Sequence, residues 1–166
     1  MIVLAAAFGL NNELGTEDGK PLWNLPDEYN RFRESILGHP IILGRKSWDV
    51  VGEPIPGSLN IVITRRTDYA GKGVIVTHSI EEALEKAGSN KSVYVIGGGD
   101  IFNLSMKYAN RLEVSRIDAY FPDATAFFPE ISKYDWKLTS SEKHGKDARH
   151  AYSFEFQIWE RQGIAN

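Results

Sequence analysis

The sequence predicts an α/β protein with a mostly parallel central sheet of about eight strands flanked by about four helices. Short apolar runs alternate with helical patterns over most of the chain, and this order of elements produces parallel strands. Residues 2–8 are uniformly apolar, as expected of a strand covered on both faces. Residues 152–160 alternate between apolar and polar, which predicts a long strand at the end of the sheet, antiparallel to another at 136–140.

Local signals place the other elements. Pro26 suits the first turn of a helix that should end near Gly38. The preceding loop, 9–24, is polar and long enough to act as a lid. Ser79 and Glu82 have the spacing of a helical capping box. The remaining expected elements are strands at 40–43, 60–64, 74–77, 92–96 and 111–117, helices at 46–51, 80–86 and 100–107, and turns at 54–57 and 97–99.

Composition narrows the class of protein. A chain of 166 residues predicts one domain, 1–166, and its net charge of −3 argues against nucleic-acid or acidic-membrane binding. The absence of cysteine excludes disulfides, thiolate metal sites and a cysteine nucleophile, and fits a cytoplasmic location. The four histidines are scattered without metal-ligand spacing, so no metal site is predicted. The apolar start at 1–8 is too short to span a bilayer and lacks the basic start of a signal peptide.

One carboxylate, Glu28, falls on the apolar stripe of the helix that starts at Pro26. At about 100° per residue, its neighbours on that stripe are Leu25, Tyr29, Phe32 and Ile36. Asp27 and Arg31 fall on the polar face, where their i,i+4 spacing predicts an ion pair that leaves Glu28 without a local partner. A carboxyl group in apolar surroundings has a raised pKa and can donate a proton near neutral pH. The structural alternative places Glu28 at the edge of the core with no chemical role.

Three predicted strand ends carry residues suited to a dinucleotide. Glycines 97–99 lie between a strand and a helix, where bare backbone can approach a pyrophosphate, although a tight turn explains them equally well. Arg45 and Lys46 open a helix, where cations oppose the helix dipole and so need another reason to be present. Arg65 follows a further strand. Two basic clusters beside a glycine turn favour NADPH over NADH, since an arginine accommodates the extra 2′-phosphate.

Two further side chains are candidates. Trp23 precedes the helix, and its indole N–H requires a hydrogen-bond partner if it is buried. A water or a ligand can be that partner. The alternative is that the ring only packs against its neighbours. Ser115 is a hydroxyl on a predicted core strand and can serve Glu28, a ligand amine or a nearby carbonyl. No serine lies in a nucleophile elbow, so covalent catalysis is not indicated.

A set of motifs runs in order along nearly the whole chain. They are Ala6-Ala7, Trp23-Asn24-Leu25-Pro26 with an acid two residues later, Phe32, Gly44-Arg45-Lys46-Ser47-Trp48, Pro54-Ile55-Pro56-Gly57, Asn60, Ile96-Gly97-Gly98-Gly99 with Ile101-Phe102, Ser115-Arg116-Ile117-Asp118-Ala119 and Phe128-Pro129. Together they resemble the dihydrofolate reductase family. The combination is far more specific than any one of its members.

The resemblance implies a cytoplasmic enzyme of one-carbon metabolism that reduces 7,8-dihydrofolate to 5,6,7,8-tetrahydrofolate. Hydride passes from NADPH to C6, and N5 is protonated. Glu28 would be the pterin-binding carboxylate, paired with the N3 and 2-amino edge. It would promote N5 protonation through water near Trp23. The loop at 9–24 would close over the site and exclude water.

The resemblance also implies a set of binding residues. Those for substrate are Ala5, Ala6, Glu28, Tyr29, Phe32, Val51, Ile55, Ile96 and Ser115. Those for the cofactor are Ala7, Gly15, Gly44, Arg45, Lys46, Ser47, Thr64, Arg65, Ile96, Gly97, Gly98, Gly99, Asp100, Ile101 and Phe102. The family is commonly monomeric, which is the expectation for this chain.

Three departures from the family pattern bear on the substrate. Pro21-Leu22-Trp23 replaces the usual Leu-Pro-Trp, and Glu28 replaces the aspartate usual in bacteria. Ser58 stands where the family has an arginine that clamps the glutamate tail, with Glu53 in a neighbouring position that is often basic. Loss of that arginine predicts weaker tail binding, which Arg31 or Arg33 would have to offset.

Ser58 keeps other substrates open. Riboflavin-pathway reductases share this architecture and NADPH but act on a ribosylated aminopyrimidine, and a free dihydropterin is a further alternative. An alternative from a different functional class is a nucleotide-binding module without catalytic activity. NADPH oxidation with and without dihydrofolate separates these readings.

Overall fold

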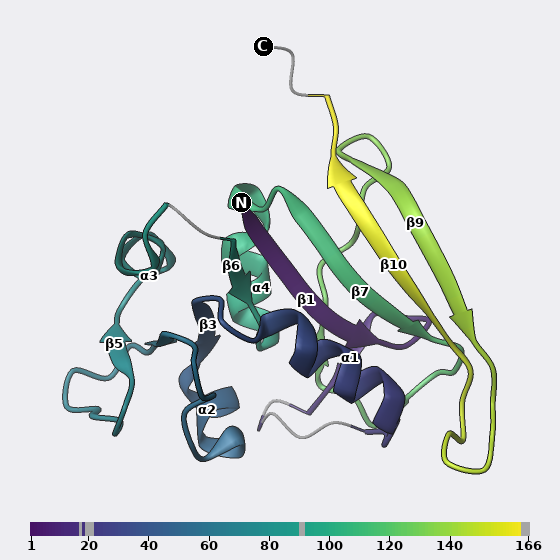
Figure 1. Ribbon diagram of the computed structural model, residues 1–166, viewed down its shortest axis with the longest axis horizontal. Coiled ribbons are helices and arrows are strands. Elements are labelled where there is room, and N and C mark those ends of the chain that lie inside the picture. The colour runs from purple at the N-terminus through teal and green to yellow at the C-terminus, as the bar shows by residue number, and fades with distance from the viewer. Residues whose placement is uncertain (17, 19–21, 90–91, 164–166) are drawn as a thin grey trace.

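The computed structural model describes residues 1–16, 18, 22–89 and 92–163. Its large sheet contains β1 (Ile2–Phe8), β3 (Ile41–Gly44), β4 (Asn60–Ile63), β5 (Ile75–Thr77), β6 (Val93–Val95), β7 (Arg111–Ile117), β9 (Trp136–His144) and β10 (Phe154–Arg161). These eight strands lie in the order β5-β4-β3-β6-β1-β7-β10-β9 (Figure 1). All neighbours from β5 to β7 pair in parallel, whereas β10 is antiparallel to both β7 and β9. The predicted fold class is confirmed.

Four α-helices occur in the described part of the chain, as expected. They are α1 (Pro26–Ile36), α2 (Arg45–Val51), α3 (Ile80–Ala87) and α4 (Gly99–Ser105), the last continued by a 3-10 turn η1 (Met106–Tyr108). Pro26 begins α1 as predicted. The predicted capping hydroxyl is also present, because the Ser79 side chain accepts the Glu82 N–H at 3.0 Å.

The sheet lies between two apolar layers because successive side chains of β1 point to opposite faces. Leu4 packs on the side that includes α3 and α4. Val3 and Ala5 pack on the other side, with Ile36 and Phe32 of α1. Full burial of a residue such as Ile36 contributes about 2 kcal/mol, so this contact fixes α1 against the sheet.

A second, small sheet was not predicted. It pairs β2 (Glu13–Gly15) with β8 (Ala126–Phe127) in antiparallel fashion. The buried Glu13 carboxylate accepts the N–H groups of Asn11 and Phe121, both at 2.5 Å, and so holds the two segments together. Such a sheet depends on backbone pairing and one buried acid, which hydrophobic periodicity does not reveal.

The C-terminal strands also differ from their expected bounds. β9 extends to His144 rather than ending at Ser140, because Ser141, Glu142 and Lys143 continue the ladder with β10 despite their polar, exposed side chains. Polar residues are suited to the edge of a sheet, where one side of the strand faces water.

Candidate active site

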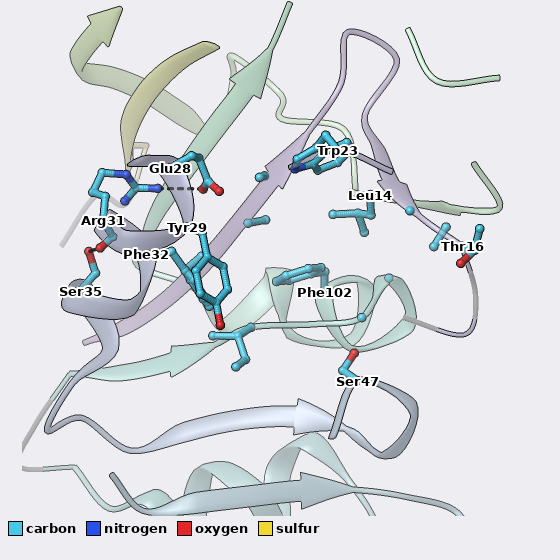
Figure 2. A pocket seen from close by; sticks show the side chains of 18 residues that line it. Leu14, Thr16, Trp23, Glu28, Tyr29, Arg31, Phe32, Ser35, Ser47 and Phe102 are labelled. Carbon is cyan, nitrogen blue, oxygen red and sulfur yellow. Dashed lines mark hydrogen bonds and ion pairs between the residues drawn. The ribbon is translucent and has the colours of Figure 1, made fainter. Parts of the chain in front are cut away.

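A cleft of about 280 Å³ opens at the carboxyl ends of β1 and β6, bordered by α1 and the start of α4. Ligands of α/β sheets bind at such strand ends. Figure 2 shows α1 contributing Glu28, Tyr29, Arg31 and Phe32 on one side, with Leu14, Thr16 and Trp23 opposite. The full lining is Ala5, Ala6, Ala7, Leu14, Gly15, Thr16, Trp23, Glu28, Tyr29, Arg31, Phe32, Ser35, Ser47, Ile96, Gly98, Gly99, Phe102 and Ala126.

Glu28 lies at the α1 side of this cleft and is 7 % exposed. The prediction that it lacks a local partner is wrong, because Arg31 Nη2 lies 3.2 Å from Glu28 Oε1. The predicted Asp27–Arg31 pair is wrong for the same reason. Arg31 turns toward the sheet and donates to Ser115 Oγ at 3.0 Å, while its guanidinium stacks 3.7 Å from the centre of the Phe156 ring.

Burial raises the pKa of Glu28 above its ordinary value. The positive charge of Arg31 opposes this increase, as does hydrogen bonding to Ser115 and Arg31. Desolvation outweighs these effects, so the direction agrees with the one expected from the apolar stripe. The carboxyl group is therefore suited to hold a proton closer to neutral pH than an exposed glutamate does.

Trp23 lines the cleft and packs against Phe121, with ring centres 4.9 Å apart. Leu14, Gly15 and Thr16 of the loop before α1 reach the same cleft. Pro21, one of the departures from the family pattern, lies outside the described residues. The described part of this loop therefore forms the wall of the cleft opposite α1.

Bare backbone forms the floor between β6 and α4. Gly97 has a φ of +116°, which favours glycine, and its carbonyl accepts the Gly44 N–H at 2.7 Å. A Cβ atom on Gly97 would lie 3.0 Å from Phe102 Cε2. Gly98 and Gly99 line the cleft itself. At Gly98 and Gly99 this floor leaves room for close approach of an anionic group, and the phosphate-binding role of the three glycines stays a prediction.

The sequence of residues 1–161 matches the family model described as "Dihydrofolate reductase". The chain belongs to the dihydrofolate reductase family. It is 33% identical over 162 residues to the dihydrofolate reductase of Bacillus subtilis (strain 168), covering 98% of this chain and 95% of that one. It is 32% identical over 162 residues to dihydrofolate reductase type 3 of Salmonella typhimurium, covering 98% of this chain and 99% of that one.

A solved structure agrees. Dihydrofolate reductase from Enterococcus faecalis, complexed with NADP(H) and RAB-propyl, superposes with a TM-score of 0.89 at 29% identity, covering 98% of this chain and 97% of that one. As a dihydrofolate reductase, this chain is an NADPH-dependent oxidoreductase of folate metabolism. The full-length match favours dihydrofolate over the other substrates considered above.

Eleven predicted site residues do not line the cleft. Ile55 is buried in the core with Phe32, and Ser115 is fully buried behind Glu28 and Arg31. Val51 is 40% exposed at the end of α2. The other eight are Gly44, Arg45, Lys46, Thr64, Arg65, Gly97, Asp100 and Ile101.

The basic residues predicted to hold phosphates lie on the α2 and β4 side of the cleft floor. Lys46 and Arg65 are exposed, whereas Arg45 is bound to Asp49 at 2.8 Å. Ser47 reaches the cleft from the first turn of α2. None of these three basic residues lines the cleft, so their contact with the phosphates of NADPH stays a prediction.

Five lining residues were not among the predicted catalytic or binding residues: Leu14, Thr16, Arg31, Ser35 and Ala126. Leu14 and Thr16 belong to the predicted lid at 9–24, and Arg31 was named only as a possible partner of the glutamate tail. Arg31 and Ser35 lie one turn apart on α1, and the Ser35 hydroxyl donates to the Arg31 carbonyl at 3.0 Å. The i,i+3 spacing of Glu28 and Arg31 was a usable signal, because residues three apart share a helix face. Ser35 and Ala126 have no comparable signal in the sequence.

The histidines are less scattered in space than in sequence. His144 and His150 meet Asp27 and Asp147, with one potential ligand atom of each within 4.8 Å of the others. Both ring nitrogens of each histidine already have protein partners. The cluster is therefore explained by hydrogen bonding between α1 and the β9–β10 hairpin.

Among the described residues, no helix is both long and apolar enough to cross a membrane.

Proposed function

We propose that Glu28 binds the pterin ring of dihydrofolate and promotes the protonation that accompanies its reduction. The observation that carries this proposal is a carboxyl group with 7 % exposure, a raised pKa and a place in the wall of the cleft. Its two oxygens suit the adjacent N3–H and 2-amino donors of the pterin. This pairing orients the ring, with its C6=N5 bond toward the glycine floor.

The cofactor would lie along the floor formed by Gly98 and Gly99, with Ala7 and Phe102 beside its nicotinamide. NADPH, when bound, supplies the hydride that is transferred to C6. Residues of this chain promote protonation of N5 and exclude bulk water. A water near Trp23 delivers the proton to N5, and Glu28 promotes this transfer, so that the C=N bond gains one hydride and one proton. Leu14 and Thr16 help to exclude bulk water from this step.

The glutamate tail of the substrate is held differently from the family pattern. Ser58 donates to the carbonyl of Ile36 at 3.3 Å and offers no charge. Arg31 is occupied by Glu28 and so does not replace the missing arginine. Arg33, half-buried on α1, makes no ion pair with the described residues and is the cation we assign to the tail.

Substitution Glu28→Gln tests the proposal. It keeps the shape of the side chain and removes the acidic group. We expect kcat/KM for dihydrofolate at neutral pH to fall by about 10²-fold or more, with the Kd for NADPH unchanged. Glu34→Gln, an exposed acid on the same helix, is the matched control and should leave both constants unchanged. Equal turnover in Glu28→Gln and the wild type would overturn the assignment.

We also propose that residues 1–166 act as one domain and as a monomer in the cytoplasm. The support is the family to which the chain belongs, whose members are commonly monomeric. Size-exclusion chromatography with light scattering tests this. A dimer whose dissociation abolishes activity would contradict it.

A further inference from the structure

A second buried carboxylate, Glu113 of β7, lies on the face of the sheet that α1 covers and has no part in the function proposed above. It is 7 % exposed and does not line the cleft. Both of its oxygens lie 3.2 Å from the Tyr94 hydroxyl, and its Oε2 lies 3.4 Å from Arg111 Nε. A hydroxyl donor and a guanidinium are suited to a carboxylate anion. A negative charge is therefore held inside the protein beneath α1.

The register of the sheet places Glu113 next to the row of residues that receives Arg31. Ser115 of β7 pairs with Phe156 of β10, and Arg31 lies over both. Glu113 pairs with Ile158, two residues away along the same strands and on the same face. Two residues of a strand span about 7 Å, a distance over which charges in a partly buried site still interact.

Arg31 is the cation that Glu28 and Glu113 have in common. Figure 2 shows its ion pair with Glu28 at the wall of the cleft. Burial lowers the pKa of Arg31, and the negative charges of Glu28 and Glu113 both oppose this decrease. One guanidinium therefore interacts with two buried carboxylates, of which only Glu28 reaches the cleft.

The second carboxylate should make the ionised form of Glu28 less stable. Burial raises the pKa of Glu28, and the positive charge of Arg31 opposes that increase. The negative potential of ionised Glu113 partly cancels the potential of Arg31 at the Glu28 carboxyl group. Glu113 thus acts in the same direction as burial, and against Arg31.

The other ionisable groups near Glu28 do not replace Glu113 in this effect. Glu28, Tyr29 and Arg31 are the titratable residues among those that line the cleft. Asp27, the neighbouring acid on α1, points away and pairs with two basic residues of the β9–β10 hairpin, His144 and Arg149.

The groups that surround Glu113 leave it as the acid nearest to Arg31 on the sheet side. Tyr94 of β6 keeps its proton, because burial and the charge of Glu113 raise its pKa to about 12. The ring of His39, from the turn after α1, lies 5.2 Å from that of Tyr94. Glu160 of β10 lies 3.5 Å from Arg111 Nε, at the outer end of the network.

We propose that Glu113 is a positioning residue for the reduction, which acts through Arg31 and favours the protonated form of Glu28 near neutral pH. This role rests on the function proposed above for Glu28. It adds to that function a second acid, outside the cleft, that sets how readily the first one holds a proton. Loss of the charge at position 113 should therefore move the pH dependence of the reaction to lower pH.

The protonation of Glu28 can be measured directly, by NMR titration of enzyme labelled with carbon-13 at its glutamate carboxyl groups. The Glu28 signal is the one that is missing from Glu28→Gln. In Glu113→Gln, we expect the midpoint of this titration to move to lower pH by about half a unit or more. The pH profile of kcat should move with it, so that kcat above the midpoint falls by about threefold or more, with little change in the KM for dihydrofolate.

Glu160→Gln is the matched control, because Glu160 shares Arg111 with Glu113 but is 41 % exposed on β10. It should leave the titration of Glu28 and the kcat profile unchanged. Glu113→Asp, which keeps the charge, should lie closer to the wild type than to Glu113→Gln in both measurements. Should Glu113→Gln fail to fold, Glu113→Met removes the same charge and takes its place.

An unchanged Glu28 midpoint in the uncharged variant, or an equal shift in Glu160→Gln, would overturn the role of Glu113. A lower midpoint only on loss of the charge at 113 supports it. The kinetics test the proposed function separately. A kcat profile that does not follow the Glu28 midpoint would refute the role of Glu28 in protonation, while the NMR titration would still decide whether Glu113 acts on Glu28.

Discussion

The imidazole of His150 accepts the backbone N–H of Asp27 at 3.0 Å, across 123 positions of sequence. This bond caps the first turn of α1, where Leu25 at the N-cap provides no side-chain cap. The other ring nitrogen of His150 lies 2.7 Å from Asp147 Oδ1, which fixes the orientation of the ring. The hairpin between β9 and β10 therefore anchors the helix turn that carries Glu28.

Replacement His150→Ala should destabilise the protein and disturb the site together. It removes a fully buried ring, leaves the Asp27 N–H without its cap and frees Asp147, so we expect the free energy of unfolding to fall by about 2 kcal/mol or more. The KM for dihydrofolate should rise because Glu28 is the next residue along. Urea unfolding and steady-state kinetics measure the two effects. His78→Ala, in which only a partly buried bond to the Thr64 carbonyl is lost, should cost less than about 1 kcal/mol.

The pair of His144 and Asp27 should make stability depend on pH. His144 donates to Asp27 at 2.9 Å and to the Gly145 carbonyl at 2.8 Å, so both nitrogens carry protons. The bond to Asp27 raises the pKa of His144 above its ordinary 6.5, and the same bond lowers the pKa of Asp27 below 3.8.

The direction of each pH effect depends on which protonation state the folded protein stabilises. Stability from His144 is fully present below pH 6.5 and is lost as pH rises through the raised pKa of the folded state. Stability from Asp27 is present above pH 3.8 and is lost as pH falls through its lowered pKa. The difference in unfolding free energy between wild type and His144→Gln should be largest between these values. Urea unfolding from pH 4 to pH 9 checks this, and a difference that grows toward pH 9 would contradict it.

Introducing an arginine by Ser58→Arg should restore the missing contact with the glutamate tail. A charge-assisted bond contributes about 1.5–3 kcal/mol, so the KM for dihydrofolate should fall by about tenfold or more. A dihydropterin without glutamate should show no change and serves as the control substrate. An unchanged KM for dihydrofolate would mean that the tail does not pass residue 58.

Substitution Gly97→Ala should weaken cofactor binding as well as folding. Both Gly97 and Gly38 have positive φ, at +116° and +79°, but a Cβ on Gly38 meets nothing within 4 Å. Gly38→Ala should thus cost only backbone strain, about 1–2 kcal/mol. Gly97→Ala adds crowding of Phe102 and should cost about 1 kcal/mol more, with a raised Kd for NADPH. Thermal unfolding and fluorescence titration compare the two, and equal Kd values would argue against a cofactor on this floor.

Local patterns predicted most of the framework. Uniformly apolar runs marked β1 and its neighbours, Pro26 marked the start of α1, and Ser79 marked the start of α3. These signals are local because they depend on side chains within one or two turns. The sheet of β2 and β8 was missed because it is held by the buried carboxylate of Glu13, whose partner Phe121 is 108 positions away.

The sequence by itself determined the alternation of strands and helices and the place of Glu28 on the apolar stripe of α1. It also carried the motifs of the dihydrofolate reductase family. Only the tertiary structure decided the partners of the charged residues. Arg31 pairs with Glu28 instead of Asp27 because Phe156 and Ser115 of the sheet receive its guanidinium. Asp27 turns to His144 and Arg149 because the β9–β10 hairpin brings them there. A helix presents each side chain in a fixed direction, but the elements that pack around it determine which charges are desolvated together.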